Sequence, residues 1–152
     1  MSVLNVGAGH DIVPGAVNLD VLALPGIDVV HDLAVAPWPF PDGRFDEVRA
    51  VDVLEHLPPR TPDGRASVVA FVEEAWRVLT PGGLLCIQTP RHDAAFMWDD
   101  PTHVRGFTER SMDFFDPDRP YGQSTGFYSA ATFKVDCETI PNLNLRFRMV
   151  KR

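Results

Sequence analysis

Two glycines and two aspartates mark where this chain could bind a ligand. Gly7-Ala8-Gly9 directly follows the apolar run Val3–Val6, and a glycine turn after a strand lets the backbone approach a ligand closely. Asp20 and Asp32 each end a further short apolar stretch. In an open α/β sheet, ligands bind at the edge where parallel strands end. The spacing therefore predicts that both carboxylates lie beside the glycine turn.

These residues fit a ribose and an adenine better than they fit a dinucleotide. A dinucleotide fingerprint has a third glycine, where this chain has Ile12, and a helix N-terminus that faces the pyrophosphate. Pro14-Gly15 leaves no room for that helix, and Asp20 comes well before the roughly 20-residue spacing of a ribose carboxylate. A ligand with a ribose and an adenine but no phosphate removes these difficulties. S-adenosylmethionine is such a ligand.

Short apolar runs between glycines and prolines predict the strands that position these residues. Five such runs cover residues 3–6, 16–20, 27–31, 45–51 and 84–88. Apolar residues at helical spacing predict a helix over residues 65–79, with Asp63 as its N-cap. Two alternating runs within residues 133–151 predict a C-terminal antiparallel hairpin. Because the early connections are too short for long helices, we expect an α/β fold with a mainly parallel seven-stranded sheet and few helices.

Four ordered motifs resemble class I S-adenosylmethionine-dependent methyltransferases, particularly the methyltransferase type 11 group. They are residues 4–9, Asn18-Leu19-Asp20, residues 38–57 and residues 74–83. The resemblance covers roughly residues 3–90 and implies a Rossmann-like methyltransferase fold. It also implies an enzyme that uses S-adenosylmethionine. The length of 152 residues fits one methyltransferase domain over residues 1–152, in which residues 91–130 form a substrate-side insertion.

The resemblance implies a role for each residue of the glycine turn and for the first aspartate. Gly7, Ala8 and Gly9 would pass under the methionine and ribose portions of the cofactor. Asp20 would accept hydrogen bonds from both ribose hydroxyls, a charge-assisted contact.

The same resemblance extends the cofactor site to both ends of the ligand. Asp32 and the backbone of Leu33 would contact the adenine, and Asp52 would lie near the methionine end. Asn5 would accept a hydrogen bond from the methionine ammonium. The family often has an acidic residue at that position, so Asn5 provides less charge pairing.

His103 is the candidate catalytic residue. Methyl transfer is an in-line displacement that depends mainly on alignment, and a base helps when the acceptor is a hydroxyl or a protonated amine. His103 follows the fifth predicted strand, where such folds place acceptor residues, and its alternative role is to pin the loop by hydrogen bonds. Aromatic residues of the same region predict an apolar acceptor surface: Trp98, Phe107, Phe115 and Tyr121. We expect O- or N-methylation of a small molecule.

Two alternatives remain open at this point. Asp52, Glu55 and His56, with a later histidine, resemble the metal sites of small-RNA terminal methyltransferases and ubiquinone-pathway O-methyltransferases, and such ligands suit Mg²⁺ or Mn²⁺. Metal-free relatives carry similar motifs, so the sequence alone favours no metal. The second alternative is a non-catalytic S-adenosylmethionine-binding or regulatory module.

Composition limits the partners of the chain. The formal net charge of −7 disfavours nucleic acid, whose phosphates bind basic surfaces. No apolar run approaches the roughly 20 residues of a membrane span, and the first residues do not resemble a signal peptide. We therefore expect a cytoplasmic protein without membrane or nucleic-acid partners. The short early connections leave one sheet face thinly covered, which predicts a homodimer.

Overall fold

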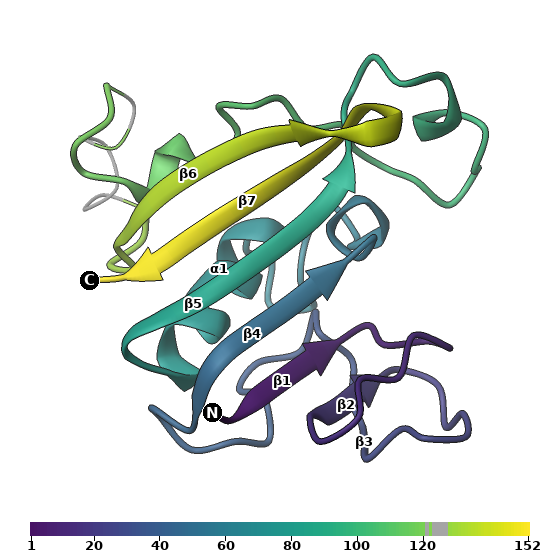
Figure 1. Cartoon of the computed structure of the whole chain (residues 1–152), viewed down its shortest axis with the longest axis vertical. Coiled ribbons are helices and arrows are strands. Elements are labelled where there is room, and N and C mark those ends of the chain that lie inside the picture. The colour runs from purple at the N-terminus through teal and green to yellow at the C-terminus, as the bar shows by residue number, and fades with distance from the viewer. Residues whose placement is uncertain (121, 123–127) are drawn as a thin grey trace.

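The chain forms one seven-stranded sheet (Figure 1). This computed structural model describes residues 1–120, 122 and 128–152. The strands are β1 (Val3–Val6), β2 (Val17–Asp20), β3 (Val29–Val30), β4 (Phe45–Val51), β5 (Leu79–Pro90), β6 (Phe133–Ile140) and β7 (Asn144–Lys151). Their order across the sheet is β3-β2-β1-β4-β5-β7-β6. Strands β1 to β5 pair in parallel, whereas β7 is antiparallel to both β5 and β6. The predicted seven-stranded sheet with a C-terminal hairpin is confirmed.

The order of the strands reverses direction at β1. Strand β1 pairs with β2 on one side and with β4 on the other, so the chain winds outward in both directions from this point. Ligands of open α/β sheets bind in the crevice at the carboxyl ends of the strands that flank such a switch point. Gly7, Asp20 and Asp52 directly follow or end these strands, so the topology alone brings them to one edge.

One face of the sheet packs against the helix α1 (Ser67–Val78), which lies behind β4 and β5 in Figure 1. Phe71, Val72 and Ala75 of the helix are buried against this face. The helix begins two residues later than predicted, and its N-cap is Ala66, without a side-chain cap. Asp63 is therefore not the cap; its carboxylate accepts hydrogen bonds from Thr61 and Arg65 instead. No helix among the described residues is long and apolar enough to cross a membrane.

The opposite face of the sheet carries charged side chains. One row across four strands runs through Arg49, Cys86, Arg148 and Asp136, and all four side chains are exposed or only partly buried. In Figure 1 this face is turned toward the viewer, and no described helix lies in front of it. The thin coverage was expected, but a charged face does not demand an apolar partner. The predicted homodimer stays a prediction.

The described part of the segment between β5 and β6 consists largely of turns, with the short 3₁₀ helices η2 (Ala95–Met97) and η3 (Asp113–Phe115). Phe107 and Phe115 are 4% and 2% exposed and belong to the hydrophobic core. The prediction that they offer an acceptor surface is therefore wrong, because both rings are buried in the hydrophobic core. Trp98 is 62% exposed, and Tyr121 lies outside the described residues.

Candidate functional site

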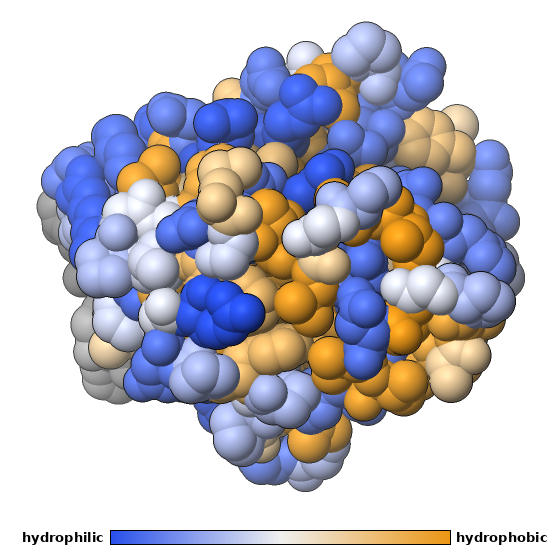
Figure 2. Space-filling view, turned by 60° about the horizontal axis from the view of Figure 1, so that its bottom comes forward, coloured by the Kyte–Doolittle hydropathy of each residue, from blue (hydrophilic) through white to orange (hydrophobic). Residues whose placement is uncertain are grey.

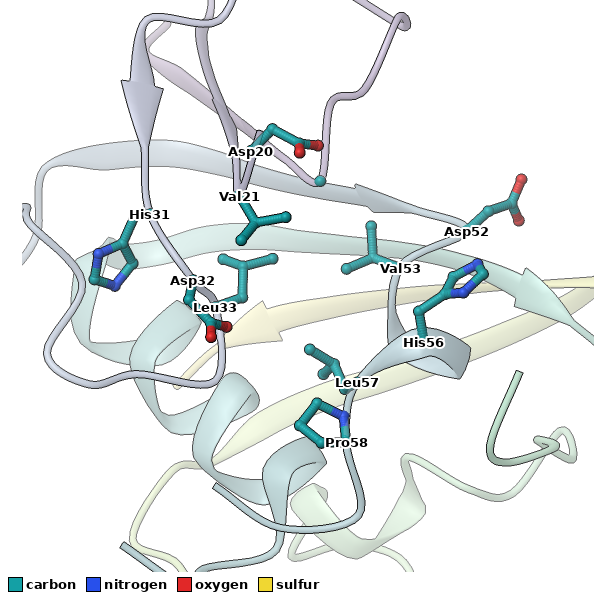
Figure 3. A pocket seen from close by; sticks show the side chains of 11 residues that line it. Asp20, Val21, His31, Asp32, Leu33, Asp52, Val53, His56, Leu57 and Pro58 are labelled. Carbon is teal, nitrogen blue, oxygen red and sulfur yellow. The ribbon is translucent and has the colours of Figure 1, made fainter. Parts of the chain in front are cut away.

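A cavity of about 290 Å³ opens at the carboxyl edge of the sheet (Figure 3). In that view His31 and Asp32 lie at the opposite end of the pocket from Asp52 and His56. The 3₁₀ helix η1 (Leu54–His56) follows β4 and forms the second end. The complete lining consists of Gly7, Asp20, Val21, His31, Asp32, Leu33, Asp52, Val53, His56, Leu57 and Pro58. The pocket thus contains five of the predicted cofactor residues.

The glycine turn brings the backbone close to the wall of this pocket. Gly7 has a φ of 62°, and a Cβ at this position would lie 2.4 Å from Cγ2 of Val53. Only glycine combines this conformation with this close approach. Gly9 also has a positive φ, of 50°, but a Cβ there would meet no atom within 4 Å. Gly9 contributes its backbone N–H instead, which donates to Asp20 Oδ2 at 2.9 Å.

Asp20 is fixed by the backbone on both sides. Its Oδ2 accepts from the N–H of Gly9, and its Oδ1 accepts from the N–H of Leu22 at 2.9 Å. The residue is only 9% exposed. A carboxylate offers about four lone-pair sites, so two backbone contacts leave acceptor capacity on both oxygens. Asp20 is therefore a preoriented acceptor for two neighbouring hydroxyl groups.

The end of the pocket at β3 combines a carboxylate with apolar walls. Asp32 Oδ1 accepts from the N–H of Ala34 at 2.8 Å, and the carbonyl of Leu33 accepts from Trp38 Nε1 at 3.3 Å. Val21 and His31 also line this end, and the sequence analysis missed both. The position of Val21 directly after the strand-end Asp20 was the signal that could have identified it.

Exposed apolar side chains gather around this end of the molecule. Val21, Leu22, Val30 and Val35 are 41–59% exposed and belong to β3 or to the turns that follow β2 and β3. Figure 2 turns this end of the molecule forward and shows apolar surface among hydrophilic residues. Apolar walls with a few oriented polar groups are typical of small-ligand sites, and they suit the flat face of an adenine.

Asn5 and Ala8 lie beside a different cavity, of about 200 Å³, which Gly7 also lines. Asn5 is 4% exposed, and its Nδ2 donates to the carbonyl of Asp11 at 2.8 Å and to Asn18 Oδ1 at 3.0 Å. The side-chain amide of Asn5 therefore stabilises the glycine turn through these hydrogen bonds. The structure does not bring Asn5 and Ala8 into the main pocket, and their cofactor contacts stay predictions.

Asp52 occupies a strained position at the end of β4. Its φ is 53°, a conformation that side-chain-bearing residues seldom adopt and that clusters at functional sites. Its N–H donates to the carbonyl of Gln88 at 2.9 Å, which fixes the turn after the strand. Partial burial raises the pKa of Asp52, while the neighbouring His56 and His103 act in the opposite direction.

Two histidines and a buried carboxyl meet beside this aspartate. The rings of His56 and His103 have their centroids 4.5 Å apart, and Glu55, which belongs to η1, is fully buried. Thr89 Oγ1 donates to Glu55 Oε2 at 3.0 Å. Among the described residues, Glu55 Oε1 has no hydrogen-bond partner. Burial raises the pKa of Glu55 to about 7.

His103 reaches this cluster from the segment that follows β5, and its acceptor-side role stays a prediction. Its Nδ1 lies 2.7 Å from the carbonyl oxygen of Met97, and the N–H of Val104 donates to the carbonyl of Glu55 at 2.9 Å. His103 therefore also ties the loop, which was its alternative role. The two roles are compatible, because the hydrogen bond to Met97 uses Nδ1, while Nε2 lies 3.7 Å from Asp100 Oδ2.

Comparison with known proteins identifies the family of the chain. A family model described as a methyltransferase domain matches residues 6–87, which is more than half of the chain. The chain therefore belongs to the methyltransferase domain family. No curated protein matches the sequence significantly.

Solved structures extend the likeness to the whole fold. An S-adenosylmethionine-dependent methyltransferase from Archaeoglobus fulgidus has a TM-score of 0.66 at 13% identity, over 99% of this chain and 86% of that chain. An S-adenosylmethionine-dependent methyltransferase from Aquifex aeolicus has a TM-score of 0.61 at 14% identity, over 100% of this chain and 82% of that chain. The 1,6-didemethyltoxoflavin-N1-methyltransferase from Burkholderia thailandensis, solved with S-adenosylhomocysteine, has a TM-score of 0.64 at 16% identity, over 99% and 70%. The fold is the Rossmann-like methyltransferase fold.

Proposed function

We propose that this protein transfers a methyl group from S-adenosylmethionine to an oxygen or nitrogen atom of a small-molecule acceptor. The observation that carries the proposal is the convergence of Gly7, Asp20 and Asp32 on one pocket at the switch point of the sheet. Asp20 has acceptor capacity for two ribose hydroxyls, and Asp32 can accept from the amino group of adenine. A pocket without a phosphate-binding helix N-terminus suits this cofactor better than a dinucleotide.

The lining of the pocket suggests how the cofactor would lie. The adenine would fit between Val21 and Leu33, near Asp32, with the ribose at Asp20. The methionine portion would then extend past Gly7 toward Asp52. The sulfonium carries a positive charge, so a carboxylate at this end of the pocket would favour the cofactor over its neutral product.

The acceptor would approach from the side of His56 and His103. In the transfer, the acceptor atom forms a bond to the methyl carbon as the carbon–sulfur bond breaks, and the sulfonium becomes a neutral thioether. An O–H or N–H acceptor must also lose a proton. His103 is the proposed catalytic residue on this side, because its Nδ1 is held by a carbonyl and its Nε2 keeps a lone pair. We also propose that residues 91–130 form the acceptor-side segment of a single methyltransferase domain.

Ligand-dependent unfolding tests the cofactor assignment. A ligand that binds the native state at about 100 times its Kd adds about 2.7 kcal/mol to the unfolding free energy. S-adenosylhomocysteine should raise the unfolding midpoint, and NAD at the same concentration should not. Stabilisation by NAD alone would contradict the proposal. Binding of S-adenosylmethionine without methyl transfer to any of a broad panel of hydroxyl and amine acceptors would favour a non-catalytic module.

A further inference from the structure

We propose that Glu55, His56 and His103 form a binding site for one divalent transition-metal ion of the zinc type. Each residue offers one ligand atom, and the three ligand atoms all lie within 4.8 Å of one another. In a tetrahedral site, metal–ligand bonds of about 2.0–2.2 Å place two ligand atoms about 3.3–3.6 Å apart. A bound ion therefore requires the ligand atoms to move inward by about 1 Å.

The hydrogen bonds around the two histidines fix which ring nitrogen carries the proton, and this leaves the other nitrogen able to bind a metal. His103 Nδ1 lies 2.7 Å from the carbonyl oxygen of Met97, which can only accept, so this nitrogen carries the proton. Thr102 Oγ1 donates to Asp100 Oδ1 at 2.6 Å, so it must accept from His56 Nδ1, which lies 2.9 Å away. Both rings thus keep an Nε2 lone pair. Metal-binding histidines are oriented in this way, with the second nitrogen donating to an oxygen.

The buried carboxyl provides an independent indication. Glu55 is fully buried, and among the described side chains its Oε1 contacts no hydrogen-bond partner. An unpaired carboxylate oxygen is costly in the interior unless a cation or a donor satisfies it. In the tautomers described above, neither Nε2 carries a proton, so neither can donate to the carboxylate. A cation between the carboxylate and the two rings satisfies all three ligand atoms at once.

The kinds of ligand select the class of ion. Two imidazoles and one carboxylate, with a fourth position free, form a typical catalytic zinc site. Mg²⁺ instead prefers oxygen ligands and retains several waters. Asp52 is not among the three clustered residues; it lines the proposed cofactor pocket instead. The cluster therefore has two nitrogen ligands and one carboxylate, whereas the sequence resemblance implied two carboxylates. The sequence alone favoured no metal, because metal-free relatives carry similar motifs. The structure adds the observation that His103 lies beside Glu55 and His56.

The role of the ion, unlike its binding, rests on the proposed function. The free fourth position could take the acceptor oxygen or nitrogen and lower its pKa. The acceptor proton would pass to solvent before the methyl carbon is attacked. In that case His103 holds the ion instead of taking the proton itself.

Calorimetric titration tests the site directly. The full chain, without an affinity tag and stripped of metal by a chelator, is titrated with ZnCl₂ and separately with MgCl₂. We expect Zn²⁺ to bind at one site per chain and more tightly than Mg²⁺. His56→Ala, His103→Ala and Glu55→Gln should each weaken Zn²⁺ binding at least tenfold. His92→Ala is the matched control, because His92 is exposed and outside the cluster, and its affinity should equal that of the wild type.

Circular dichroism shows whether each variant is folded. If His103→Ala does not fold, His56→Ala decides the question, because His56 is exposed and its loss leaves the core intact. Equal Zn²⁺ affinity in His56→Ala and His92→Ala would overturn the site, as would preferential binding of Mg²⁺. A parallel titration with S-adenosylhomocysteine separates the proposals: cofactor binding without Zn²⁺ binding removes the metal site alone.

Discussion

The two ends of the candidate site are built in different ways. At the end that faces β2 and β3, Asp20 and Asp32 end or follow strands. Each carboxylate accepts from the backbone N–H two residues later, and Asp20 also accepts from Gly9, eleven residues earlier. At the other end, η1 and the segment around His103 lie almost fifty residues apart in sequence. Tertiary contacts join them, such as the hydrogen bond from the N–H of Val104 to the carbonyl of Glu55. The first end follows from local sequence and the second from long-range folding.

If the cofactor end depends on its tight backbone, Gly7→Ala should have the largest effect on stability. An alanine at a φ of 62° costs about 1–2 kcal/mol, and crowding against Val53 adds about 1–3 kcal/mol. Gly9→Ala is the control, because it shares the positive φ but has free space around its Cβ. Urea unfolding should show a clearly larger loss for Gly7→Ala. Equal losses would mean that the Val53 side chain moves aside and that its close approach to Gly7 does not affect stability.

Asp20→Ala should weaken S-adenosylhomocysteine binding by about 2–4 kcal/mol, because a charge-assisted contact is lost and the ribose hydroxyls are left unpaired. The same change also removes the acceptor for two backbone N–H groups, so Asp20→Asn, which keeps the shape, is the companion variant. Asp136→Ala, on the exposed charged face, should bind normally. Unchanged affinity in Asp20→Ala, measured by calorimetry, would place the ribose elsewhere.

Asp32→Ala should have a smaller effect, about 1–1.5 kcal/mol, which corresponds to one hydrogen bond to the adenine amino group. A deaminated analogue, S-inosylhomocysteine, sharpens the test. The wild type should prefer the adenine ligand, and Asp32→Ala should lose most of that preference. A variant that still discriminates fully would show that the amino group is recognised by another residue.

His103→Ala should change S-adenosylhomocysteine affinity the least, by less than twofold. Its ring contacts His56 and the Met97 carbonyl and does not line the pocket that contains Asp20 and Asp32. Calorimetry on the folded variant measures this directly. A loss comparable with that of Asp20→Ala would erase the distinction between the two ends of the site.

This distinction also explains which features could be predicted from sequence. The glycine turn, Asp20 and Asp32 were predictable because a strand end fixes both the position and the direction of the next residue. The hairpin over residues 133–151 was predictable because side chains alternate between two faces. Both predictions depend only on local periodicity.

The remaining features depend on contacts that no local pattern encodes. Phe107 and Phe115 have the composition of an acceptor surface but fill the core, since a loop sequence does not reveal which side meets the sheet. Asn5 ends up bracing Asn18 because two neighbouring strands place their amides together. The contact between Glu55, His56 and His103 could not be predicted, because it depends on the path that the chain takes after β5.

The central claim is that the pocket at the switch point binds S-adenosylmethionine, and a crystal structure with S-adenosylhomocysteine tests it most directly. We predict both ribose hydroxyls within hydrogen-bond distance of the Asp20 carboxylate and the adenine amino group beside Asp32. The sulfur should lie at the end of the pocket that contains Asp52 and His56. A ligand bound outside this pocket, or bound with its adenine at Asp52, would contradict the account.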